Sequence, residues 1–425
     1  MMSMKKIIFG ALAVLVLGAG VFVLADIEKP TVVENVTQKL VKRTATALPA
    51  LTLTPHTVTF SDGSTATFRL PEGFSISVAA ENLGKARFMT WSPDGRLFVP
   101  DLVDYNLSHE GRLFVLEDFD AKTGRFNTTH TYLSGLRGPN SVAFYTDDTG
   151  QHWLYLALTQ HLVRYPYEDG DTEPSGEPEV VVEFPNEQSH GEVSVVWHIT
   201  RTILFHNDRL YVSVGSGCNS CEELTGDMRA MIYSMAPDGT DQRVEGDGLR
   251  NTVGIAMAEG TLYATANGVD HLGADRPDET MYKIEGGKHY GWPYCYVKDG
   301  ENMADTSQVW ETPLECAEVP LPVTTFAPRS APLGLTYFEK AHPALQGAFL
   351  VALHGSFEQW IGSGYELVRV STKGEQELFM SGFLDENGER VARAVDILQY
   401  DKNSLFISDD HGGRIFYIYA DQEDE

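Results

Sequence analysis

The stretch HNDRLYVSVGSG, residues 206–217, decides the fold of this chain, because its pattern occurs in six copies. It consists of a polar turn, a run rich in Val, Leu and Tyr, and a small-residue end. Such a run is typical of a β-strand that follows a tight turn. The other copies are SPDGRLFVPD (92–101), DDTGQHWLYLALT (147–159), EGTLYATANG (259–268), LQGAFLVALHGS (345–356) and DKNSLFISDDHGG (401–413).

The copies are regularly spaced. Equivalent positions lie 52 to 57 residues apart, except for a step of 87 between the fourth and fifth copies. Further strand-like runs closed by polar turns lie between them. A repeat of this length that holds about four strands is typical of a propeller. We therefore predict an all-β fold, a six-bladed β-propeller of four-stranded blades, with about thirty residues inserted after the fourth unit.

The two ends of the repeat array indicate how the ring closes. The last copy leads into GRIFYIYADQEDE (413–425), where the chain stops and leaves the sixth blade one strand short. The stretch GFSISVAAENL (73–83) precedes the first copy and has a strand-like pattern. We expect it to supply the missing strand.

Composition limits the partners of this chain. Its 425 residues, 42% of them hydrophobic, suffice for a sizeable core, and its formal net charge is −28. A chain this acidic repels phosphate backbones and anionic lipid, so nucleic acid is excluded as an expected partner. Basic residues that gather locally therefore point to an anionic ligand.

The N-terminus predicts export. Lys5 and Lys6 precede an uncharged apolar run over residues 7–25, just long enough to cross a bilayer. A cleaved signal peptide and an uncleaved anchor in the inner membrane both remain open. We expect a periplasmic or extracytoplasmic protein with a signal peptide or N-terminal membrane anchor over 1–26, a tether over 27–70 and the propeller over 71–425.

The four cysteines, an even number in an exported chain, favour two local disulfides: Cys218 with Cys221, and Cys295 with Cys316. The first spacing also suits a redox dithiol or half of a metal site. However, Glu222 follows where c-type haem needs His, no second C-x-x-C exists, and no thioredoxin-like pattern surrounds the motif. A structural disulfide is the preferred interpretation.

The loops before each copy lead to the mouth of the central channel, the usual place for a propeller's site. Arg201, Arg250, Arg329 and Arg393 stand at corresponding points of four units. Each alone is most simply paired with a carboxylate, but four on one axis favour a polyanionic ligand. His198 is either a structural histidine or a general base, since an imidazole of pKa about 6.5 can accept a proton.

The stretch over 266–293 combines Asp270, Asp275, Asp278 and Glu279 with glycine-flanked carbonyls. Oxygen-rich irregular backbone suits a hard cation such as Ca²⁺. The spacing is not that of an EF-hand, so an ordinary acidic loop remains the alternative.

An ordered set of motifs carries a family resemblance that runs from about Leu70 to Ile418. The chain resembles the pyrroloquinoline quinone (PQQ) dependent sugar dehydrogenases, in particular the sorbosone dehydrogenase-like branch related to soluble aldose (glucose) dehydrogenases. The motifs are LPEGFSISVAAENLGKARFMTWSPDGRLFV (70–99), HITRTILFHNDRLYVSVGSGCNSC (198–221), LRNTVGIAM (249–257), GGKHYGWPYC (286–295), SAPLGLTYF (330–338) and FLVALHGSFEQWIGSGYELVRV (349–370).

The resemblance implies a six-bladed propeller with PQQ and Ca²⁺ at the channel mouth. It implies a catalytic His at His198, a paired Arg-Asn at Arg250 and Asn251, and an amide contact at Asn140. Basic contacts to the cofactor fall near His354 and Arg393, and Arg329 stands where a His is more usual. The implied metal ligands are the carbonyls of Gly268 and Val269 and, at a second calcium site, Asp278, Glu279 and the carbonyl of Tyr290.

The implied reaction is oxidation of a sugar or a sugar-derived alcohol or aldehyde, with hydride passing to PQQ and His198 as the base. Electrons would then leave to an external acceptor, a quinone or cytochrome. Two other classes stay open: a calcium-dependent propeller lactonase or hydrolase, and a non-catalytic exported propeller that binds a partner. We expect substrate specificity in the loops over 297–328 and 108–114.

Overall fold

The computed structural model describes residues 48, 50–105, 108–185, 197–223, 226–311 and 313–420. The chain divides into two units, residues 1–37 and 38–425, and everything described here belongs to the second. The expected signal or anchor over 7–25 lies outside the described residues. Among those that are described, no helix has the length and apolar character needed to cross a membrane.

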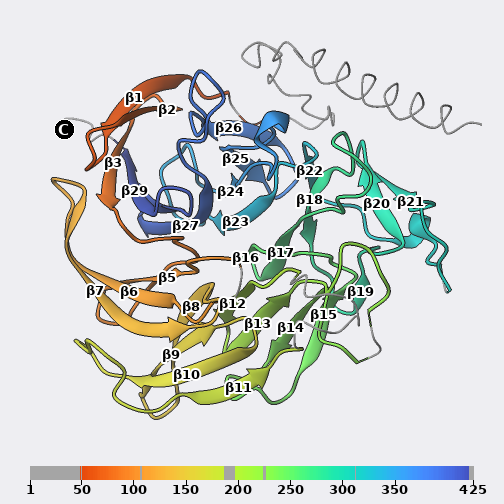
Figure 1. Ribbon diagram of the computed structural model, residues 1–425, viewed down its shortest axis with the longest axis horizontal. Helices are drawn as coiled ribbons and strands as arrows, with labels where there is room; N and C mark the ends of the chain where they lie inside the picture. Colours follow the sequence, from red (N-terminus) through yellow and green to blue (C-terminus); the bar gives the residue numbers. More distant parts are fainter. Residues whose placement is uncertain are drawn as a thin grey trace, which may run out of the picture. The chain divides into compact units, whose positions relative to one another are not determined.

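Six sheets are arranged around a common centre, which confirms the six-bladed β-propeller (Figure 1). Blade one contains β4 (Thr90–Trp91), β5 (Leu97–Asp101), β6 (Gly111–Asp120) and β7 (Arg125–Leu136). Blade two contains β8 (Ser141–Thr146), β9 (His152–Ala157), β10 (His161–Tyr167) and β11 (Glu179–Glu183). Blade three contains β12 (Arg201–His206), β13 (Arg209–Val214), β14 (Met231–Met235) and β15 (Arg243–Asp247).

The other three blades follow the same order. Blade four contains β16 (Ile255–Ala258), β17 (Thr261–Ala266), β18 (Glu279–Lys283) and β22 (Thr324–Phe326). Blade five contains β23 (Pro332–Tyr337), β24 (Ala348–Leu353), β25 (Glu366–Ser371) and β26 (Gln376–Met380). Blade six contains β27 (Ala394–Asp401), β28 (Ser404–Asp409), β29 (Arg414–Ala420) and β3 (Phe74–Ala80).

The six sequence copies form the second strand of each blade: β5, β9, β13, β17, β24 and β28. These strands are covered on both faces by neighbouring blades, and every residue of β5, β24 and β28 is buried. That burial explains why the copies read as continuous apolar runs rather than as an alternation.

The ring closes as the sequence predicted. The early strand β3 pairs antiparallel with β29, the last strand of the chain, and Ile76 lies opposite Ile418. Closure of this kind leaves no open edge between the first and last blades.

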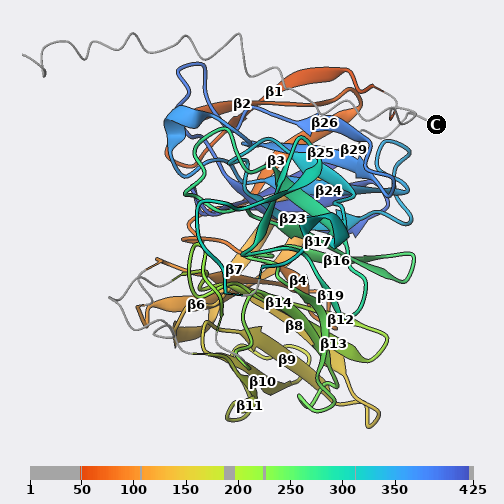
Figure 2. The ribbon, with the colours of Figure 1, turned by 90° about the vertical axis from the view of Figure 1, so that its right-hand side faces the viewer.

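The hairpin of β1 (Leu53–Thr59) and β2 (Thr65–Pro71) corrects the last part of the expected tether, and the part before residue 48 lies outside the described residues. Phe68 and Leu70 are fully buried, and the ring of Phe68 packs edge-on against Phe416 with centroids 5.1 Å apart. Figure 2 shows the hairpin beside β26. Buried and exposed residues alternate along β2, so one face of the strand packs against the propeller. The hairpin therefore belongs to the folded domain.

The inserted segment lies between β18 and β22. It contains β19 (Lys288–His289), which adds to blade three in parallel with β15, the hairpin of β20 (Cys295–Lys298) and β21 (Glu301–Ala304), and the short helix η1 (Cys316–Glu318). Both expected disulfides are formed, Cys218 with Cys221 and Cys295 with Cys316, and no cysteine is free.

Candidate active site

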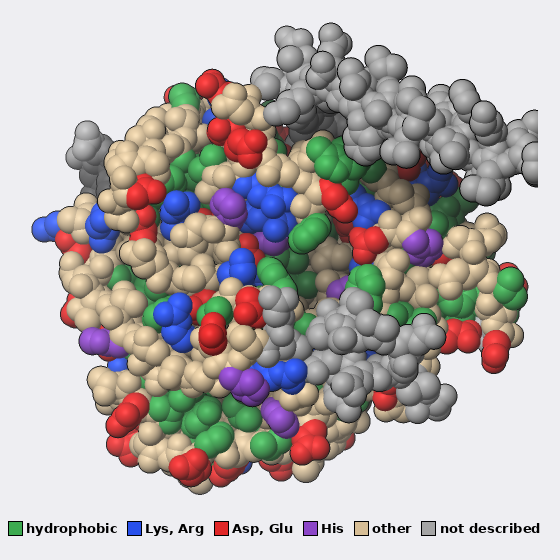
Figure 3. Space-filling model, in the orientation of Figure 1, with side chains coloured by type: hydrophobic (Ala, Val, Ile, Leu, Met, Phe, Trp, Pro, Cys, Tyr) green, Lys and Arg blue, Asp and Glu red, His purple; other side chains and the backbone are tan. Residues whose placement is uncertain are grey.

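A cavity of about 350 Å³ lies where the loops that lead into several blades meet. Figure 3 shows a face of the molecule on which basic and His side chains gather near the middle among apolar and acidic groups. The cavity is lined by Arg87, Tyr105, His198, Ile199, Thr200, Arg250, Asn251, Val253, Asn267, Gly268, Asp270, Glu279, Arg329, Ala331, Leu333, His354, Phe357 and Glu358.

The formal charges of this wall cancel. Three arginines, Arg87, Arg250 and Arg329, stand against three carboxylates, Asp270, Glu279 and Glu358. Asp270 is paired with both Arg250 and Arg329. Even with the pKa of Glu279 raised to about 7 by burial, the arginines leave little positive surplus for a polyanion. An anionic ligand would require a further positive charge in the cavity.

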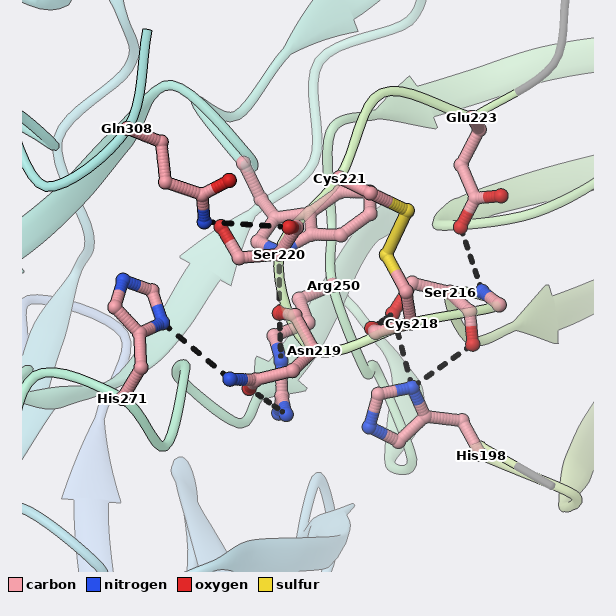
Figure 4. The surroundings of a disulfide bond; sticks show 12 residues. His198, Ser216, Cys218, Asn219, Ser220, Cys221, Glu223, Arg250, His271 and Gln308 are labelled. Carbon is pink, nitrogen blue, oxygen red and sulfur yellow. Dashed lines mark hydrogen bonds between the residues drawn. A yellow bond between two sulfur atoms is a disulfide. The ribbon is translucent and has the colours of Figure 1, made fainter. Parts of the chain in front are cut away.

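His198 precedes β12, and its Nδ1 is turned toward Ser216 (Figure 4). The distances from Nδ1 to the carbonyl oxygen and the Oγ of Ser216 are 3.0 and 2.9 Å. A carbonyl oxygen only accepts hydrogen bonds, so Nδ1 carries the hydrogen and Nε2 keeps its lone pair. Burial, and then the charge of Arg250, hold the pKa of His198 well below its usual value. The imidazole is therefore neutral, with Nε2 as a proton acceptor.

Gly215 makes room for this histidine. A Cβ added at Gly215 would lie 2.5 Å from the Cβ of His198 and 2.8 Å from the Oδ1 of Asn251. His198 itself has φ of 43°, in the left-handed region that a residue with a side chain rarely adopts. The surrounding structure must hold such a conformation, and these conformations cluster at functional sites.

Arg250 lies just before β16 and has only 6% of its surface exposed. Its guanidinium donates to the carbonyl oxygens of Asn219 (2.9 Å) and Gly268 (2.6 Å). It also donates to Asn219 Oδ1 and Asp270 Oδ2, both at 2.8 Å. Four charge-assisted hydrogen bonds fix the orientation of this guanidinium at the cavity wall.

Asp270 joins Arg250 to a second arginine. Its Oδ1 accepts a hydrogen bond from Arg329, while its Oδ2 accepts from Arg250. Arg329 also donates to the carbonyl oxygen of Gly273, and its backbone N–H donates to Glu279. Arg329 thus lines the cavity with much of its hydrogen-bonding capacity already engaged.

His354 follows β24 and lies 2.8 Å from the buried carboxylate of Asp410. Burial lowers the pKa of His354 to about 4, against the opposing effect of Asp410. The ring is therefore neutral, and its Nε2–H donates to the carboxylate. Arg87 and the Tyr105 hydroxyl also donate to Asp410, at 2.8 and 3.0 Å.

The basic group on this side of the wall is Arg87, which sequence reasoning missed. A signal was present: Arg87 lies just before the first strand of blade one, the kind of position that singled out the other arginines.

Three of the residues expected to face the anionic ligand, Asn140, Arg201 and Arg393, are absent from the cavity lining. Asn140 is fully buried beneath Arg87, whose Nε donates to its Oδ1 over 2.9 Å. Arg201 donates to the carbonyl oxygen of His198 over 2.6 Å. Arg393 donates to the carbonyl oxygen of Gly355 over 2.6 Å. Of the four arginines expected to converge, Arg250 and Arg329 line the cavity.

Oxygen atoms gather where the resemblance implies a metal. Asn267 Oδ1 is buried and has no hydrogen-bond partner among the described residues. Glu279 is buried beside it in the lining, and burial raises the pKa of its carboxyl to about 7. Gly268 belongs to the same wall, but its carbonyl oxygen accepts a hydrogen bond from Arg250, and the Val269 side chain packs with Ala230 and Trp292. Neither Asn267 nor its unpaired oxygen was anticipated from the sequence.

The residues of the second implied calcium site line two different cavities. Asp278 and Tyr290 line a small cavity of about 50 Å³, whereas Glu279 lines the large one. The separation follows from chain geometry, because consecutive side chains of extended backbone point in opposite directions. Lys298 Nζ lies 3.7 Å from Asp278 Oδ1 and supplies a positive charge there.

Comparison with known proteins decides the family. The TrAA12-like family matches residues 68–421, most of the chain and all six blades. The chain belongs to the TrAA12-like family. This TrAA12-like chain is also 23% identical to an uncharacterised protein of Borreliella burgdorferi, over 84% of its own length and 92% of that protein.

Solved structures share the fold of this TrAA12-like protein. The holo form of the pyranose dehydrogenase PQQ domain from Coprinopsis cinerea has a TM-score of 0.63 and 19% identity, covering 83% of this chain and 97% of that one. The calcium structure of the AA12 enzyme from Trichoderma reesei has a TM-score of 0.64 and 18% identity, covering 83% of this chain and 96% of that one. The PQQ-bound aldose sugar dehydrogenase from Streptomyces coelicolor has a TM-score of 0.55 and 20% identity, covering 82% of this chain and 99% of that one.

Proposed function

We propose that this chain is a PQQ- and calcium-dependent sugar dehydrogenase whose active site is the cavity around His198 and Arg250. The observation that carries the proposal is a neutral histidine with Nε2 available as an acceptor, beside a buried arginine, in a fold shared with PQQ-binding sugar dehydrogenases. The substrate would be an aldose or a sorbosone-type sugar.

The residues fit these cofactors. PQQ carries three carboxylates, and the wall offers Arg87, Arg250 and Arg329 as cations. Because the wall's own carboxylates cancel these charges, a bound Ca²⁺ would supply the surplus that the anion needs. The unpaired Asn267 Oδ1 and the nearby Glu279 carboxylate are oxygen ligands of the kind that Ca²⁺ prefers.

Each residue has a distinct task in the proposed reaction. His198 Nε2 accepts the proton of the sugar hydroxyl as the hydrogen on the same carbon leaves as hydride. When bound, the quinone supplies the hydride acceptor and Ca²⁺ polarises it. Arg250 stabilises the negative charge that develops on oxygen, in an orientation already set by its own hydrogen bonds. Ser216 holds the His198 tautomer that makes Nε2 the acceptor.

The sugar ring would rest on the rim formed by Phe357 and Glu358. Phe357 lines the cavity yet is 84% exposed, so its flat face is free to pack against the C–H face of a pyranose. Arg390 holds its backbone by donating to the carbonyl oxygens of Ser356 and Phe357. Among the described residues of the 297–328 insertion, none lines the cavity, so we now assign specificity to this rim.

The electrons would leave to a separate acceptor, a quinone or cytochrome, as we expected from the sequence. Two disulfides fit an oxidising compartment, in keeping with the proposed export to the periplasm or beyond.

A lactonase is the less supported alternative. Among the described residues, the one group of three or more potential His, Cys, Asp or Glu ligand atoms is Cys218, Cys221 and Glu223, and its cysteines are joined to each other. A hydrolytic metal held by several acidic side chains therefore has no evident ligand cluster in this cavity.

One titration tests the proposal. PQQ and Ca²⁺ are added to the purified chain, and the quinone absorbance is followed before and after a panel of aldoses and sorbosone. We expect saturable binding and bleaching by at least one sugar. Binding without bleaching by any sugar would support a non-catalytic binding protein, and the absence of binding would favour the lactonase.

A further inference from the structure

The loop closed by the Cys218–Cys221 disulfide lies against both residues that the proposed reaction uses (Figure 4). The carbonyl oxygen of Asn219, inside this loop, accepts from Arg250 Nε at 2.9 Å and from Trp292 Nε1 at 3.1 Å. Its side-chain oxygen accepts from an Arg250 terminal nitrogen at 2.8 Å. One residue therefore takes two of the four hydrogen bonds of the Arg250 guanidinium.

The orientation of the Asn219 amide is set by its neighbours. The backbone N–H of Asp270 can only donate, and it lies 2.9 Å from Asn219 Oδ1. The amide nitrogen consequently faces His271 Nδ1 at 3.3 Å, which must accept. The other ring nitrogen of His271 then donates to Asp305 Oδ2 over 2.9 Å. This chain from Asp305 to Asn219 keeps the amide oxygen on Arg250.

The same loop reaches His198 from its other end. The Ser216 hydroxyl donates to the carbonyl oxygen of Cys218 over 2.6 Å. With its hydrogen committed there, the Ser216 oxygen can only accept from His198 Nδ1. The Cys218 carbonyl therefore helps to keep the hydrogen of His198 on Nδ1 and the lone pair on Nε2.

We propose that Asn219 is a positioning residue for Arg250, and that the Cys218–Cys221 disulfide is the brace that keeps Asn219 and the Cys218 carbonyl in place. Activity of the protein would then depend on the oxidised state of this one disulfide. The inference rests on the proposed function for its effect on turnover, and on geometry alone for its effect on Arg250.

The first test compares Asn219→Ala, Asn219→Asp and Gln308→Ala. The Ala variant lacks the side-chain acceptor, and we expect PQQ affinity and kcat each to fall about tenfold, the usual worth of one hydrogen bond to a charged group. The Asp variant keeps an oxygen toward Arg250 and should recover most of both. Gln308 donates to the carbonyl oxygen of Ser220 in the same loop and makes no hydrogen bond to Arg250 or His198, so Gln308→Ala should match wild type.

The second test opens the brace with a dithiol reagent. Two electrons and two protons pass from the dithiol to the sulfurs, the S–S bond breaks, two S–H bonds form, and the reagent closes to a cyclic disulfide. We expect kcat and PQQ affinity to fall in wild type and in a Cys295→Ser/Cys316→Ser variant, which keeps only the disulfide at the site. A Cys218→Ser/Cys221→Ser variant should start low and not respond. Thermal unfolding checks that each protein remains folded.

These outcomes separate the two proposals. If wild type binds no PQQ, the proposed function fails, and a crystal structure of apo Asn219→Ala still tests whether Asn219 positions Arg250. Arg250 should then leave its bonds to Gly268 and Asp270 in that structure. The inference would be overturned if Asn219→Ala and Cys218→Ser/Cys221→Ser both fold and both keep the PQQ affinity, the kcat and the Arg250 position of wild type.

Discussion

His354 and Asp410, 56 residues apart in the chain, form a buried hydrogen bond of 2.8 Å at the wall of the cavity. Burial lowers the pKa of His354 to about 4 against the opposing effect of Asp410, so the ring is neutral and donates its Nε2–H to the carboxylate. The positive charges of Arg87 and Arg393 also lower this pKa, because they disfavour a second proton on the ring. The pair therefore predicts how stability depends on pH.

Stability should fall as the solution is acidified. The ordinary pKa of His is about 6.5, so below that pH the unfolded chain binds a proton that folded His354 refuses. The free energy of unfolding should drop by about 2 kcal/mol between about pH 7.5 and 5 through this residue alone. His354→Gln keeps a donor toward Asp410 without a titrating group. Urea unfolding at both pH values should show a shallower pH dependence for the variant, and equal slopes would contradict the assignment.

Replacement of His198 should separate chemistry from binding. His198→Ala removes the proton acceptor and leaves Arg87, Arg250 and Arg329 in place, so we expect sugar oxidation to fall by about 10²–10⁴ while PQQ still binds. Stopped-flow reduction of bound PQQ and an equilibrium titration measure the two effects. Turnover within tenfold of wild type would remove His198 from the role of base.

Arg250 and Ca²⁺ should act together on PQQ binding. Because the charges of the cavity wall cancel, Arg250→Ala should weaken PQQ binding by about tenfold to a hundredfold. Chelation of calcium should weaken it further. The measurement is a PQQ titration of wild type and variant, each with and without chelator, and re-addition of Ca²⁺ should restore wild type. Equal affinities in all four conditions would mean that the cavity does not hold a quinone tricarboxylate as proposed.

Phe357 should affect the sugar and not the cofactor. Phe357→Ala removes the exposed ring at the rim, so KM for the sugar should rise several-fold with PQQ affinity and kcat nearly unchanged. Trp360→Ala is the matched control, since Trp360 is likewise a well-exposed aromatic residue (74%) but does not line the cavity. A KM unaffected for every oxidised sugar would show that the ring rests elsewhere.

The candidate site shows where sequence reasoning is strong and where it fails. His198 and Arg250 were predicted because each stands just before a repeated strand, and repeats bring such points to one axis; both line the cavity. Arg87 satisfies the same rule and was overlooked. Asn267 could not have been found, because its signature is a buried oxygen without a partner, and that depends on every neighbouring side chain.

The cysteines show a similar limit. Their number and spacing were enough to predict both disulfides, which form as expected. The interpretation as purely structural staples overlooked the position of Cys218–Cys221. Its loop meets Arg250, about thirty residues later, only because the loops after β13 and before β16 come together at the channel mouth.

The sequence by itself determined the six-bladed propeller and its closure by β3, because both are written in local patterns of apolar runs and turns that recur at a regular interval. The tertiary structure alone decided the protonation states and the charge balance of the site. The neutral forms of His198 and His354, and the cancelling charges of the wall, arise from burial and from residues that lie up to hundreds of positions apart. Local sequence patterns do not show which distant residues come into contact, so they cannot predict these protonation states.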